Sequence, residues 1–127
     1  MSISTLPVIR CLIAMTMFGA AGSTIAQTLP RAFDASPDIY KVLAEDDKYV
    51  VVEANYKPGQ RSKLFSSPAY LFYLVSDCHL RKHHPDGQVV DNGPSLAGFA
   101  GHAPGFDSAA FENVGKNACR IVSFAPK

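Results

Sequence analysis

Short apolar segments separated by turn residues most constrain what this chain can fold into. Tyr49 to Tyr56 (YVVVEANY) is rich in the β-branched and aromatic residues that strands prefer. The segment 69–75 (AYLFYLV) is strongly apolar, and it is too short for a typical helix, so it is expected to be a buried strand. Similar patterns predict further strands at 38–44, 78–84, 88–91 and 118–125.

Turn signals lie between these predicted strands. Pro58-Gly59 and Pro85-Asp86-Gly87 favour tight reversals, because proline presets one backbone angle and glycine tolerates a positive φ. Residues 92–108 are rich in Gly, Pro and Ala, and they are expected to form a long loop. No helical periodicity is evident beyond the N-terminal region. The pattern therefore predicts an all-β domain, either a sandwich or a barrel.

The N-terminal 26 residues resemble a cleavable secretory signal peptide. Arg10 is the charge before the apolar run Cys11 to Ala20, and small residues lead to a predicted cleavage after Ala26. The run is shorter than the ~20 residues that span a bilayer. An uncleaved anchor or a buried first helix is the alternative. Cleavage would leave a lead-in segment at 27–37 and a β-domain at 38–127, in a periplasmic or secreted protein.

The charge balance of the expected mature chain excludes some partners. Arg10 is the single charged residue lost with the signal, which leaves 11 basic and 11 acidic residues. A neutral surface gives no electrostatic reason to bind nucleic acid, or to stay on a membrane once the signal is removed. Cys78 and Cys119 remain, and an oxidising compartment would allow them to form a disulfide. Two separate buried thiols are the alternative.

The order of the turn residues resembles the two sequence motifs of the cupin family. The first motif runs Gly, five residues, His-x-His, three or four residues, Glu, six residues, Gly. Counted from Gly59, the His-x-His positions hold Phe65 and Ser67, the Glu position holds Leu71, and the last Gly position holds Cys78.

The second cupin motif runs Gly, five residues, Pro-x-Gly, two residues, His, three residues, Asn. Counted from Gly98, Pro104 and Asn113 match this pattern, whereas Phe106 occupies the Gly position and Ala109 the His position. The phrases DIYKVL, PDG and FENVG resemble those of small bacterial cupins. The resemblance implies one small jelly-roll barrel with degenerate metal-binding motifs.

The resemblance also implies that the metal chemistry of the family is lost. A cupin site uses three imidazoles and one carboxylate, which suit divalent metals. The corresponding residues here are Phe65, Ser67, Leu71 and Ala109, and residues 57–77 contain no histidine. We therefore expect no metal, no cofactor and no catalytic residues of the cupin type.

The four histidines offer an alternative, an enzyme with an atypical site. On a strand, His79 and His83 would share one face with Arg81 between them, and a cation there opposes metal binding. A site formed by His83, His84 and His102 would require the predicted loop to bring His102 close to the other two. No Gly-x-Ser-x-Gly elbow marks a serine nucleophile.

The predicted barrel interior suggests a binding function. Its candidate lining residues are Phe65, Ser67, Leu71, Phe72 and Ala109. An apolar interior is either filled, as the core of so small a chain would favour, or open to a small apolar ligand. The sequence thus predicts an exported, non-catalytic domain that binds a small apolar molecule or a protein partner. A third alternative is an interaction module that forms a homodimer, since two-fold dimers are common.

Overall fold

The computed structural model describes residues 28–127, so the predicted signal peptide lies outside the described residues. This part of the chain forms one short helix and nine strands: α1 (Ala32–Ala35), β1 (Tyr40–Glu45), β2 (Tyr49–Tyr56), β3 (Phe65–Ser67), β4 (Tyr70–Leu74), β5 (Cys78–His83), β6 (Val89–Ser95), β7 (Ala100–Ala103), β8 (Phe106–Asn113) and β9 (Cys119–Pro126). No helix in residues 28–127 has the length and hydropathy that crossing a bilayer requires.

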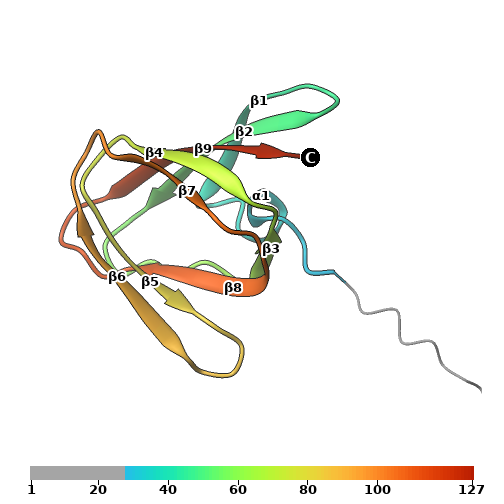
Figure 1. The fold of residues 1–127 in the computed structure, drawn as a ribbon. Helices are drawn as coiled ribbons and strands as arrows, with labels where there is room; N and C mark the ends of the chain where they lie inside the picture. Colours follow the sequence, from blue (N-terminus) through green and yellow to red (C-terminus); the bar gives the residue numbers. More distant parts are fainter. Residues whose placement is uncertain (1–27) are drawn as a thin grey trace, which may run out of the picture.

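The strands form two antiparallel sheets that enclose a barrel (Figure 1). One sheet has the order β1-β2-β9-β4-β7, and the other has the order β3-β8-β5-β6. Strand β9 pairs with β2 along its whole length and with β4 on its other side, so the C-terminal strand is central. The all-β prediction is confirmed.

Strand alternation places the core between the two sheets. In β2, Val50, Val52, Ala54 and Tyr56 are buried, whereas the residues between them are half-buried or exposed. This period of two is what the sequence YVVVEANY predicts for a strand with one face on a core. The predicted bounds of this strand match β2.

The long loop predicted at 92–108 is wrong. Strand β6 continues to Ser95, β7 lies within the supposed loop, and β8 begins at Phe106. Both β6 and β7 are edge strands. Edge strands tolerate residues such as Pro94 and Gly93, because only one side of the strand needs a hydrogen-bonded neighbour.

The predicted lead-in segment, 27–37, packs onto the barrel as far as it is described. Ala35 and Ser36 are buried. The Ser36 Oγ accepts a hydrogen bond from the Lys63 amide at 2.9 Å, and the Ser66 amide donates to the Pro30 carbonyl at 3.0 Å. The described part of this segment therefore lies against one end of the barrel (Figure 1).

Cys78 and Cys119 form a disulfide that joins the two sheets. Cys78 begins β5 in one sheet and Cys119 begins β9 in the other, with their Cα atoms 4.8 Å apart. Both side chains are buried, Cys119 completely. Of the two alternatives that the sequence leaves open, the structure has the bonded pair.

Candidate functional site

The barrel interior holds two cavities. The smaller has a volume of about 80 Å³ and the larger about 440 Å³. Four side chains line both cavities and therefore lie between them: Tyr70, Leu80, Phe111 and Ile121. Typical ligand pockets measure roughly 300–1,000 Å³, so the larger cavity falls in that range and the smaller does not.

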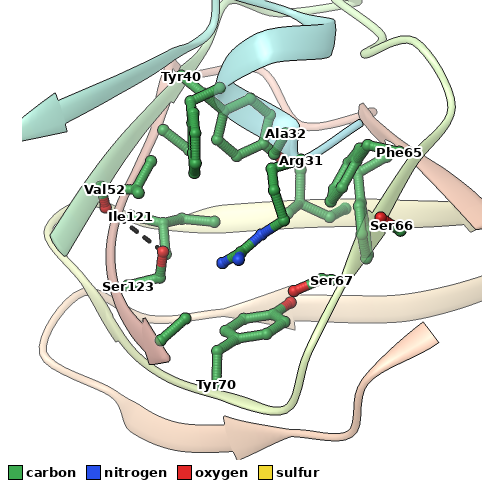
Figure 2. Close-up of a pocket in the computed structure, with 15 residues that line it drawn as sticks. Arg31, Ala32, Tyr40, Val52, Phe65, Ser66, Ser67, Tyr70, Ile121 and Ser123 are labelled. Atoms are coloured by element: carbon green, nitrogen blue, oxygen red, sulfur yellow. Dashed lines mark hydrogen bonds between the residues drawn. The ribbon is translucent and has the colours of Figure 1, made fainter. Parts of the chain in front are cut away.

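Arg31 occupies the smaller cavity (Figure 2). Its guanidinium points in between Tyr70, Ser67 and Ser123. Its Nη2 donates to the Pro126 carbonyl at 3.2 Å, and its Cζ lies 5.5 Å from the Phe33 ring centroid. Burial lowers the pKa of Arg31, and Asp34 opposes that shift, but a guanidinium remains charged in proteins. The N-terminal segment thus fills this end of the barrel.

The larger cavity lies between the two sheets at their edge strands β6 and β7. Aromatic rings form much of its wall. The Phe72 and Phe99 rings have centroids 6.0 Å apart, and those of Phe106 and Phe111 are 5.9 Å apart. Such a wall suits an apolar or aromatic molecule, because burying its surface is favourable and its ring can stack on these side chains.

Lys82 brings a positive charge to this aromatic wall. It lies opposite Phe111 in the β5–β8 register, so the two side chains share the inward face. Its Nζ is 4.5 Å from the centroid of the Phe106 ring, within cation–π distance. The side chains of Asn92 and Ser95 on β6 also border the cavity. Among the described residues, no Asp or Glu lines it.

The residues predicted to line the interior do not share one cavity. Phe65 is buried and, with Ser67, lines the smaller cavity, whereas Phe72 lines the larger one. Ala109 is fully buried opposite Phe65. The prediction that Leu71 lines the interior is wrong, because Leu71 is 57% exposed on the outer face of β4. Motif spacing selected Leu71, but strand alternation turns Tyr70 and Phe72 inward and Leu71 outward.

These positions do not fit the metal site of a cupin. Phe65, Leu71 and Ala109 have no side-chain atom that can ligate a metal, and Leu71 points away from the interior. In residues 28–127, no group of three His, Cys, Asp or Glu side chains is placed to hold a metal ion.

The histidines of β5 pair with carboxylates on its outer face. His79 Nε2 lies 2.7 Å from Asp91 Oδ1, and His83 Nε2 lies 3.0 Å from Glu112 Oε1. Arg81 lies between them, as predicted, with its Nε 3.0 Å from Asp91 Oδ2. These are cross-strand polar pairs, which stabilise a sheet.

The atypical site proposed for His83, His84 and His102 is not assembled. His83 ends β5, and His84 follows it at the hairpin. His102 is exposed on β7, in the other sheet, where it lies opposite Leu71 in the strand register. His102 also lines the larger cavity, but none of the β5 histidines lines it, so His102 does not form a site with them.

Two buried phenols lie beside the smaller cavity. The hydroxyl groups of Tyr40 and Tyr56 are hydrogen-bonded, and their rings meet edge to face with centroids 5.6 Å apart. Burial is the main cause that raises the pKa of both tyrosines well above its ordinary value, and the pKa of Tyr70 is raised for the same reason. All three therefore stay neutral at physiological pH.

The sequence prediction missed Lys82 and Phe106. Lys82 lies in the predicted strand 78–84, where we considered the face that carries His79 and His83 but drew no conclusion from Lys82 on the opposite face. Alternation places Lys82 on the same face as Cys78 and Leu80, and this signal was available in the sequence. Phe106 fell within the predicted long loop, and no local pattern marked it as an inward residue.

Comparison with solved structures identifies the fold. The cupin domain from Bordetella pertussis Tohama I superimposes with a TM-score of 0.61 at 18% identity, covering 78% of this chain and 96% of that one. A protein with a double-stranded β-helix domain from Klebsiella pneumoniae gives a TM-score of 0.52 at 23% identity, covering 69% of this chain and 76% of that one. The polyketide cyclase RemF from Streptomyces resistomycificus gives a TM-score of 0.50 at 20% identity, covering 68% of this chain and 63% of that one.

No protein-family model and no curated protein sequence matches this chain. The structural similarity nevertheless shows that residues 28–127 have the cupin fold, as the sequence resemblance implied. The fold does not fix the activity, because one fold hosts many functions.

Proposed function

We propose that this cupin-fold chain is an exported, non-catalytic protein that binds a small apolar or aromatic molecule in its larger cavity. The observation that carries the proposal is the cavity of about 440 Å³ with aromatic walls. A pocket of that size can enclose most of a small ligand. The sequence favoured a filled barrel interior. That expectation fits the end of the barrel that Arg31 occupies, but it does not fit the end that contains the larger cavity.

The composition of the cavity wall supports binding rather than catalysis. General acid–base catalysis needs a proton donor or acceptor within hydrogen-bond reach of the substrate, usually oriented by a second polar group. Lys82 and His102 line the cavity, but none of the described carboxylates lines it, and neither side chain is paired with a described carboxylate that would orient it. An enzyme on this fold remains the alternative, since the fold is shared with a polyketide cyclase.

Export is supported by two features. The N-terminal sequence has the order of a signal peptide, and the Cys78–Cys119 disulfide suits an oxidising compartment. Whether the chain also binds a protein partner or forms a homodimer stays a prediction from the sequence.

A pair of substitutions on β7 tests the proposed function. Ala103 lines the larger cavity, whereas Ala100 is exposed and lies opposite the outward Tyr73. Isothermal titration with 2-naphthylacetate and its primary amide measures binding to the wild type, Ala103→Leu and Ala100→Leu. We expect saturable binding to the wild type and to Ala100→Leu, and about tenfold weaker binding to Ala103→Leu, because the added side chain occupies the cavity. Equal binding by both variants, or no binding to the wild type, would reject the cavity as the site.

A further inference from the structure

We propose that the ligand of the larger cavity carries a carboxylate, which pairs with the Lys82 ammonium. This inference rests on the proposed function and adds to it the chemical class of the ligand: a small molecule with an aromatic or aliphatic body and one acidic group.

Lys82 differs from the other cationic side chains of β5 in its surroundings. On the outer face of the strand, Arg81 and His79 pair with Asp91, and His83 pairs with Glu112. Lys82, on the inner face, has no carboxylate within 4.0 Å among the described residues. Its neighbours there include Phe106 and Phe111, so its charge faces the cavity without an acidic partner.

A cation at an apolar wall favours a ligand that brings its own negative charge. The Phe106 ring gives Lys82 a partial electrostatic partner at 4.5 Å. A neutral ligand in the cavity would displace water from the ammonium and leave it without a replacement, which is unfavourable. A carboxylate would instead replace that water with a charge-assisted hydrogen bond, which is stronger than a bond between neutral groups.

The rest of the wall defines the body of the ligand. Phe72 and Phe99 present ring surface on the β4–β7 side, opposite the sheet that carries Lys82. A flat or slender apolar group can pack there while its acidic end reaches Lys82. Since no described Asp or Glu lines the cavity, no like charge repels a carboxylate inside it.

Matched acids and amides test this inference. Calorimetry measures the binding of phenylacetate, 3-phenylpropionate and 2-naphthylacetate, each beside its primary amide, which keeps the shape and removes the charge. The proteins are the wild type, Lys82→Met, Lys82→Arg and, as a control on the exposed β1–β2 turn, Lys48→Met. Circular dichroism verifies that each variant is folded.

We expect at least one acid to bind the wild type about tenfold or more tightly than its amide. Lys82→Met should remove this preference, because acid binding weakens and the penalty on the neutral amide disappears, whereas Lys82→Arg and Lys48→Met should keep it. Acid and amide binding equally would overturn the role of Lys82 but leave the cavity function intact. A preference for acids that persists in Lys82→Met would also overturn the role of Lys82. Binding of no probe at all would reject both proposals.

Discussion

The Lys82 ammonium lies 4.5 Å from the centroid of the Phe106 ring, across neighbouring strands of the four-stranded sheet. The same ring meets Phe65 edge-on with centroids 5.2 Å apart, and Phe65 lines the smaller cavity. Phe106 thus connects the filled end of the barrel with the open end. The inward-facing Lys82 therefore contacts a ring that itself packs against the core.

The disulfide should contribute substantially to stability. The Cys78–Cys119 bond closes a loop with a sequence separation of 41 residues and joins the two sheets. The double substitution Cys78→Ala/Cys119→Ala should lower the free energy of unfolding by about 2–4 kcal/mol, because it frees the unfolded chain from that constraint. Urea denaturation measures the change. A reductant should lower the midpoint of the wild type but not that of the variant, and a wild type insensitive to reductant would contradict the bond.

The protein should lose stability in alkali through its buried phenols. Burial in the folded state raises the pKa of Tyr40, Tyr56 and Tyr70 above the ordinary value of 10.0. The folded state therefore holds these protons while the unfolded state releases them, so stability is present below about pH 10 and falls as the pH rises further. Tyrosinate absorbance and circular dichroism, recorded together during a pH titration, test this.

The double variant Tyr49→Phe/Tyr73→Phe isolates the signal of the three buried tyrosines, since it removes the two exposed ones. In this variant, we expect tyrosinate absorbance to develop only as the β-sheet signal disappears. Full tyrosinate absorbance with an intact β-sheet signal would contradict the buried arrangement.

The β5–β6 hairpin should be sensitive to acid through Asp91. The amide of Gly93, then Arg81 and His79, hydrogen-bond to this carboxylate and lower its pKa from 3.8 to about 2. Because the folded pKa lies below the unfolded one, the stabilisation is present above about pH 4 and is lost as the pH falls toward about 2. Urea midpoints across that window should decline less steeply in Asp91→Asn than in the wild type. Parallel declines would show that Asp91 does not contribute.

The sequence predicted the architecture best where burial imposes a strict pattern. Strand β2 alternates buried and more exposed residues over its whole length, and its bounds were predicted correctly. The turn at Pro85-Asp86-Gly87 was also correct, because few other conformations suit those residues. The sequence did not decide between a disulfide and two separate thiols, because the distance between Cys78 and Cys119 depends on how the two sheets pack.

The site was less predictable, for two physical reasons. Strands β6 and β7 lie at sheet edges, where Gly and Pro are tolerated, so their composition resembles that of a loop. Leu71 was chosen from motif spacing, but its face is set by the pairing of β4 with β7 and β9. Lys82 could have been placed inward from alternation alone, yet its significance depends on Phe106 and Phe111, which a different strand supplies.

The most direct test of the central claim is methyl NMR during a titration with 2-naphthylacetate, repeated with its primary amide. Leu74, Leu80 and Ile121 line the larger cavity, whereas Leu43, Leu71 and Leu96 are exposed. We predict saturable shifts of the methyl groups of these three cavity residues, with those of the exposed leucines unchanged. Shifts confined to the exposed leucines, or no saturable shift with either compound, would contradict a ligand-binding cavity between the two sheets.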